Sequence, residues 1–190
     1  MFAHLSVLIS VILGLALAHL LRGLSKLIQH RATIKICWVH VVWTINLIAY
    51  VLAVWWGMTN WNKLQTWTTE LFFFLSFYSI VIFMLTSQFF PAEFPADMDF
   101  PKYYYSNTRW IFGMLIVALL IDVPETVWKQ VMHLRDVPAQ YVYFLPGLLA
   151  IAVISALSKN RRVHEVLSVV WLAMHAGYFT FTAIEKVVAG

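Results

Sequence analysis

Apolar residues dominate six long stretches of this chain, and short polar stretches separate them. An α-helix rises about 1.5 Å per residue, so about 20 apolar residues cross the roughly 30 Å hydrocarbon core of a bilayer. The pattern predicts an all-α polytopic membrane bundle of six transmembrane helices in a single domain over residues 1–190, with no soluble domain. The expected spans are residues 2–22, 34–56, 68–90, 105–122, 138–157 and 164–187.

The connection after the fourth apolar stretch allows two interpretations. It begins Asp122-Val123-Pro124-Glu125, an acid followed three residues later by Glu, with Pro in what would be a first helical turn. That order is typical of a helix start and predicts a short interfacial helix over 123–134. In the second interpretation the fourth span continues through Pro124 as a kinked helix, and Asp122 and Glu125 lie inside the membrane. The first interpretation is our prediction for the fold.

Proline and glycine also interrupt the fifth stretch, at Pro146-Gly147. Proline lacks an amide hydrogen and frees a helix carbonyl, which then needs a neighbour or a water-filled cavity. The pair indicates either a packing kink or a broken helix of the kind that forms transport sites.

Composition agrees with the pattern, since 62% of the residues are hydrophobic and 12% are charged. Soluble proteins average about 45–50% apolar and about 25% charged residues. These values exclude a soluble domain, a disordered chain and a nucleic-acid binder. The sequence also lacks the phosphate-binding, dinucleotide, zinc-protease, serine-hydrolase and CxxC motifs, so no enzyme class is favoured. We predict no metal site, and the single cysteine, Cys37, excludes an intrachain disulfide.

Basic residues predict the orientation. With the N-terminus outside, nine of the 13 Lys and Arg residues lie on the inner side of the membrane. Cytoplasmic connections carry the excess of Lys and Arg in membrane proteins. We therefore expect a multi-pass protein of the cell membrane, the inner membrane in a bacterium, with both termini outside.

The sixth span carries the clearest chemical pattern. Its polar and aromatic residues recur at alternating spacings of four and three, which places them on one face of a helix. They are His164, Ser168, Trp171, His175, Tyr178, Thr182 and Glu185. Polar side chains inside a bilayer are costly, so this stripe either lines a pathway or forms hydrogen bonds between helices.

Span two offers polar partners for that stripe, namely His40 and Asn46. We predict a small channel or transporter for protons, cations or a small solute, with a polar seam between spans two and six. His175 would be the central relay, Asn46 would orient it, and His164 and Glu185 would form the inner and outer ends. The predicted pathway residues are His175, Asn46, His164, Ser168, Tyr178, Glu185 and His40.

Two alternative functions rest on other residues. Ser6, Ser10, Gly14 and Ala18 form a small-residue ridge on the first span, which favours packing between helices or between subunits. That ridge is typical of a non-catalytic membrane subunit or sensor. Such a protein would contact membrane lipid and would form a homo-oligomer or bind a partner membrane protein.

The second alternative is a haem b redox protein. His19 and His40 lie at similar depths in spans one and two, which is the placement required of two axial ligands. Apart from this haem hypothesis, the sequence predicts no cofactor.

Overall fold

The structure is a computed structural model that describes the backbone of residues 2–91, 93, 95 and 98–189, and the side chains of these residues as far as 181. Within this part, the regular structure is helical, and the only bridge between extended residues joins Lys35 to Asp99. The elements are α1 (Phe2–Gln29), α2 (Trp38–Met58), the 3-10 helix η1 (Thr59–Lys63), α3 (Thr69–Ser87), α4 (Phe100–Val131), α5 (Tyr141–Leu157) and α6 (Arg161–Ala189).

Four of these helices are long and apolar enough to cross a membrane: α1, α2 with η1, α3 and α4. Helix α5 is apolar but has only 17 residues. The expectation of an all-helical fold is confirmed for the described residues, and four of the helices are candidates for membrane spans.

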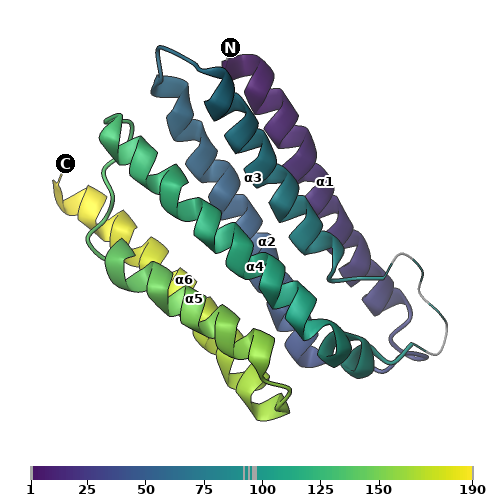
Figure 1. The fold of residues 1–190 in the computed structure, drawn as a ribbon. Helices are drawn as coiled ribbons and strands as arrows, with labels where there is room; N and C mark the ends of the chain where they lie inside the picture. The colour runs from purple at the N-terminus through teal and green to yellow at the C-terminus, as the bar shows by residue number, and fades with distance from the viewer. Residues whose placement is uncertain (1, 92, 94, 96–97, 190) are drawn as a thin grey trace.

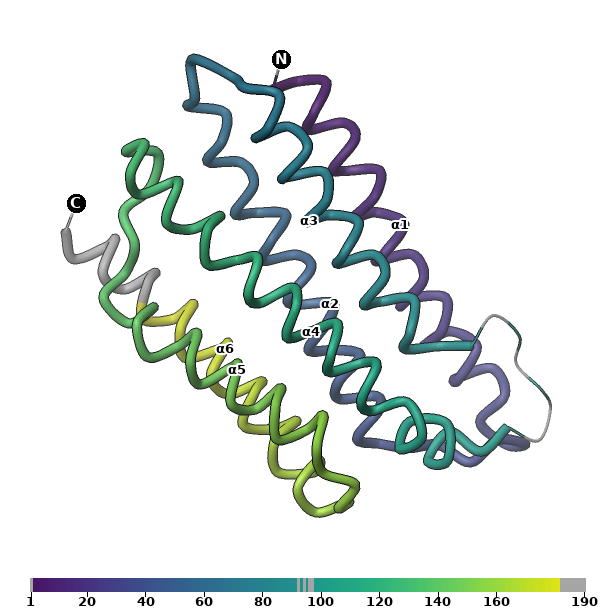
Figure 2. Tube along the Cα trace, in the orientation of Figure 1, coloured from purple at the N-terminus to yellow at the C-terminus, as the bar shows by residue number. Residues whose placement is uncertain are grey.

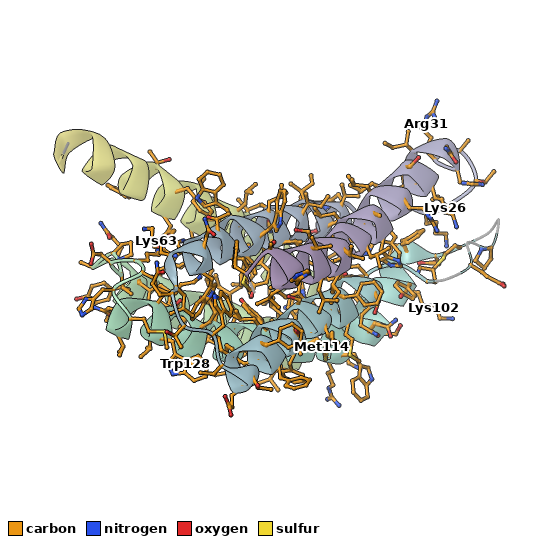
Figure 3. The ribbon with its side chains drawn as sticks, turned by 90° about the horizontal axis from the view of Figure 1, so that it is seen from above. Lys26, Arg31, Lys63, Lys102, Met114 and Trp128 are labelled. Carbon is orange, nitrogen blue, oxygen red and sulfur yellow. The ribbon has the colours of Figure 1, made fainter. Side chains whose placement is uncertain are left out.

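The helices form two layers (Figures 1, 2 and 3). Helices α1, α2 and α6 lie side by side in one layer, and α3, α4 and α5 form the other, as the contacts between neighbouring helices show. The core lies between the layers. The α5–α6 pair forms one edge of the molecule, where α6 packs on α2 and α5 packs on α4.

Helix α1 is longer than the predicted span: it ends at Gln29, whereas the prediction ended at residue 22. Its buried face continues past Arg22 through Gly23 and Leu27, at the spacing of an α-helix. Lys and Arg can extend from such a helix into water while their stems cover apolar surface, so the charged residues do not end it.

Helix α4 corrects the predicted connection between spans four and five. It runs without interruption from Phe100 through Pro124 to Val131, so the separate interfacial helix over 123–134 is wrong. Proline costs a helix one hydrogen bond, but Glu125, Thr126 and Lys129 beyond it are buried against the bundle. These tertiary contacts hold the last two turns in line with the rest of α4.

The start of α4 is fixed by Asp99, whose carboxylate accepts a hydrogen bond of 2.9 Å from the amide of Lys102. The same side chain forms an ion pair with Lys35 at 3.1 Å. The Lys102 amide and the Lys35 ammonium together hold the pKa of Asp99 below its ordinary value. This contact ties the connection before α2 to the beginning of α4.

Candidate functional site

The polar stripe of α6 faces protein. His164 and Ser168 are fully buried, Trp171 and His175 are nearly so, and Tyr178 is half-buried. On the opposite face, Val166 is 60% exposed. The side chains of Thr182 and Glu185, at the far end of the predicted stripe, lie outside the described residues.

Helices α2 and α6 meet along this stripe. The Asn46 Nδ2 donates a hydrogen bond of 2.8 Å to the carbonyl oxygen of Ser168. Beside this contact the rings of Trp43 and Trp171 pack with centroids 5.4 Å apart. Asn46 Oδ1 and both indole Nε1 atoms are buried and have no hydrogen-bond partner among the described residues. The α2–α6 seam therefore contains three buried polar atoms without a partner among the described residues, which is uncommon in native proteins.

His164 lies at one end of this seam. Its Nε2 donates to the carbonyl of Ser158 at 2.9 Å, because a carbonyl oxygen can only accept. The neutral ring then accepts the Tyr104 hydroxyl at Nδ1, over 2.8 Å. Two partners thus fix the orientation of His164.

His175 lies further along α6. Its Nδ1 donates to the Trp171 carbonyl oxygen at 3.2 Å, and its ring stacks on that of Trp171 with centroids 5.0 Å apart. The other nitrogen, Nε2, is then an acceptor in the neutral imidazole. His175 lines a cavity, so the seam ends in a space that can hold a ligand.

The cavity has a volume of about 570 Å³ and lies between α2, α4, α5 and α6. Binding sites for small ligands usually measure about 300–1,000 Å³. Both charged and aromatic side chains contribute to its walls. They include Tyr50, Trp56, Lys63, Tyr78, Asp122, Glu125, Lys129, His133, Arg135, Asp136, Tyr141, Phe144, His175 and Tyr178.

Asp122 is the centre of a tyrosine cluster in this cavity. Tyr78 donates to its Oδ1 at 3.2 Å, and Tyr141 donates to its Oδ2 at 2.8 Å. The hydroxyl of Tyr50 lies 3.2 Å from that of Tyr78. Among the described residues no cationic side chain lies within ion-pair distance of Asp122. The carboxylate is therefore oriented by phenols and remains available to a cationic ligand.

A buried ion pair between Glu125 and Lys129 forms another wall of the cavity. The side chains are only 5% and 3% exposed. Trp61 donates from Nε1 to Glu125 Oε1 at 2.9 Å, and Lys129 Nζ donates to the Gly57 carbonyl at 2.9 Å. The prediction of a surface helix hid this pair, whereas the second interpretation, a helix continuing through Pro124, placed Glu125 inside the membrane.

His40 belongs to a different environment from the other predicted pathway residues. Its Nε2 donates to the Phe89 carbonyl oxygen at 2.7 Å, and its ring packs among aromatic side chains. The structure connects it to the seam only indirectly, since Tyr104 packs against His40 and bonds His164.

His19 and His40 do not leave space for a haem between them. The Phe90 ring packs against both imidazoles, with centroids 6.3 Å from His19 and 4.8 Å from His40. That ring also fills the space beside Gly23, where a Cβ atom would lie 2.2 Å from it. The residues in this arrangement do not fit the haem hypothesis.

The small-residue ridge of α1 lies at the edge of its buried face. Ser6 and Ser10 are half-buried, whereas Gly14 and Ala18 are exposed on the outside of the bundle. Ser10 accepts a hydrogen bond of 3.2 Å from Trp55 Nε1, which joins α1 to α2. At Gly14 the outer part of the ridge has open space beside it, since nothing lies within 4 Å of a Cβ atom placed there.

Comparison with protein-family models, with curated proteins and with solved structures found no match for this chain.

Proposed function

We propose that this chain is a six-span membrane protein that moves protons, cations or a small polar solute along the α2–α6 seam. The cavity between α2, α4, α5 and α6 is its binding site at one end. The observation that carries this proposal is the continuous line of buried polar side chains from His164, past Ser168 and Asn46, to His175 and the cavity.

The burial of polar atoms along the seam supports a role in transport. Buried polar atoms in native proteins are nearly always hydrogen-bonded, yet three polar side-chain atoms of the seam have no partner among the described residues. In a bilayer such groups are costly and mark pathways for ions or solutes. In this scheme His175 accepts at Nε2 from the cavity, and Asn46 Oδ1 offers the next acceptor along the seam.

Orientation in the membrane is also part of the proposal. Figure 3 shows Lys26, Arg31 and Lys102 at one end of the bundle and Lys63 toward the other. The end with more basic residues faces the cytoplasm in most membrane proteins. The cavity then opens on the outer side, where both termini also lie.

Flux measurements in proteoliposomes test the function. Protein with the natural sequence should move protons, monovalent cations or a set of small polar solutes faster than empty liposomes. We expect His175→Ala and Asn46→Ala to abolish most of this flux. Thr180→Ala is the matched control, because its exposed hydroxyl bonds only the Ala176 carbonyl of its own helix. Flux that both seam variants retain would contradict the proposal, as would the absence of any flux.

A second candidate function is supported by the exposed part of the α1 ridge. Gly14 and Ala18 leave an open surface on which a second helix could approach closely, as in a homo-oligomer or a complex with a partner membrane protein. The oligomeric state in detergent tests this candidate. It requires an assembly that Gly14→Leu disrupts while the monomer stays folded, and a protein that is monomeric throughout rejects it.

A further inference from the structure

An apolar groove of about 480 Å³ lies beside the polar cavity, between α5 and α6. Tyr143 is 82% exposed and Phe181 61% exposed on its rim, so the groove opens on the outside of the bundle. In a membrane-spanning bundle this surface faces acyl chains. Its lining includes Tyr143, Phe144, Met174, Gly177, Tyr178 and Phe181.

One pair of aromatic rings separates this groove from the cavity. Phe144 and Tyr178 line both spaces, and their rings stack with centroids 4.2 Å apart and planes 16° apart. On the cavity side, Arg135 donates a hydrogen bond of 3.3 Å to the Tyr178 hydroxyl. The bilayer side and the polar cavity are therefore only one stacked ring pair apart.

The cavity presents opposite charges behind this wall. Arg135 lies at the wall itself, through its contact with Tyr178. The Asp122 carboxylate accepts a hydrogen bond from Tyr141, which lies one helical turn before Phe144 on α5. Among the described residues, no cationic side chain lies within ion-pair distance of Asp122. Moving inward from the groove, a ligand would pass apolar side chains and reach a cavity that holds both a guanidinium and a carboxylate.

This combination of an apolar groove and two opposite charges matches a phospholipid whose head group carries an amine. Its acyl chain is apolar, its phosphate pairs well with Arg, and its terminal ammonium pairs with a carboxylate. We propose that the cavity binds the head group of a zwitterionic phospholipid that enters from the bilayer between α5 and α6. The phosphate lies at Arg135, the ammonium at Asp122 and an acyl chain in the groove.

The depth of the site agrees with this ligand. Helix α4 has 32 residues and is about 48 Å long, which exceeds the roughly 30 Å hydrocarbon core. Asp122 lies about 14 Å from the end of this helix at Val131. Figure 3 places Trp128 at the same end as Lys63, and such Trp and Lys side chains gather at the membrane interface. The carboxylate thus lies near the boundary between the acyl chains and the head groups.

The inference rests on the cavity being a binding site, as proposed above, but not on movement along the seam. Binding of fluorescent lysophospholipids, labelled on the acyl chain, to the purified full-length protein in detergent micelles tests it. The two labelled probes are lysophosphatidylethanolamine and lysophosphatidic acid, and the second lacks the amine. Unlabelled phosphoethanolamine, which lacks the acyl chain, is the competitor. We expect the ethanolamine lipid to bind at least about tenfold more tightly than lysophosphatidic acid, because an ion pair between its ammonium and Asp122 strengthens binding by about a factor of ten.

Two variants separate the roles of the head-group site and the groove. Asp122→Asn should remove the preference for the amine. Gly177→Leu should weaken the binding of both lipids about tenfold, because a side chain there fills the groove without a clash: nothing lies within 4 Å of a Cβ atom. Gly113→Leu is the matched control and should bind as the natural sequence does, since it also adds a side chain in open space on α4. Gel filtration checks that each variant is folded.

Each outcome decides between the proposals. Equal binding of the two lipids, or binding that Gly177→Leu leaves unchanged, overturns the inference. Competition by phosphoethanolamine at the affinity of the whole lipid would show entry from water and would also overturn it. If solutes cross the membrane and no lipid binds, only this inference fails. If neither flux nor binding is seen, both proposals fail.

Discussion

Asn46 on α2 and Ser168 on α6 are 122 residues apart in the chain, and the amide nitrogen of the first donates a 2.8 Å hydrogen bond to the carbonyl oxygen of the second. Asn46 is only 1% exposed. This contact joins the α5–α6 edge of the molecule to the rest of the bundle, and it lies in the middle of the proposed seam.

Replacing Asn46 tests how much this contact stabilises the fold. We expect Asn46→Ala to lower the free energy of unfolding by about 0.6–1.7 kcal/mol, which runs from the average to the maximum measured for hydrogen bonds between membrane helices. Unfolding in mixed micelles of a mild detergent and dodecyl sulfate measures it. Thr180→Ala should change stability by less than about 0.5 kcal/mol, as exposed positions usually do. A variant as stable as the natural sequence would show that the contact only orients the side chain.

The Glu125–Lys129 pair should show strong coupling. Either Glu125→Leu or Lys129→Met alone leaves one buried charge without its partner, which typically costs about 3–5 kcal/mol. The double variant removes both charges, so we expect it to lose much less stability than the sum of the two single variants. Unfolding of all four proteins gives the coupling energy.

The exposed pair of Arg161 and Glu165, at 2.7 Å, is the control for that measurement. Its Arg161 side chain is 71% exposed, so Arg161→Ala should cost about 0–1 kcal/mol. Single variants of Glu125 and Lys129 that cost no more than this would contradict the burial of the pair.

Gly23 and Phe90 should behave as one packing unit. A Cβ atom at Gly23 would lie 2.2 Å from the Phe90 ring, so Gly23→Ala requires the ring to move. We expect a loss of about 1–3 kcal/mol, typical of an overfilled core. The same substitution in a Phe90→Leu background should cost less, because the smaller side chain leaves room.

Gly14→Ala is the matched control on the same helix, since nothing lies within 4 Å of a Cβ atom there. Alanine favours a helix over glycine by up to about 1 kcal/mol, so this variant should be as stable or slightly more stable. If Gly23→Ala behaves like Gly14→Ala, Phe90 does not occupy this site.

The haem hypothesis has a direct optical test. Because Phe90 packs against both His19 and His40, we expect the purified protein to be colourless after expression with ample haem. An absorption spectrum measures this. A Soret band that His19→Ala abolishes would restore bis-histidine ligation and would require Phe90 to leave its position.

The helical membrane architecture could be predicted from the sequence because its cause is local. An apolar stretch of about 20 residues is long enough to cross a bilayer whatever its neighbours are. The α6 stripe follows from the helical period alone. The spacing of His164, Ser168, Trp171 and His175 was sufficient to predict that they share one face, and all four are buried. The sequence also required a polar partner for the central amide of Asn46, and the structure supplies the Ser168 carbonyl oxygen on α6.

The site itself was decided by tertiary structure. Local signals at Asp122, Pro124 and Glu125 favour a helix start, yet α4 continues through them because the bundle buries Glu125 and Lys129 together. Likewise, nothing in the order of residues shows that Tyr78 and Tyr141 converge on Asp122 from two other helices. A sequence determines the period and the polarity of each helix, whereas the choice of neighbours depends on how all the helices pack at once. The cavity is a product of that packing.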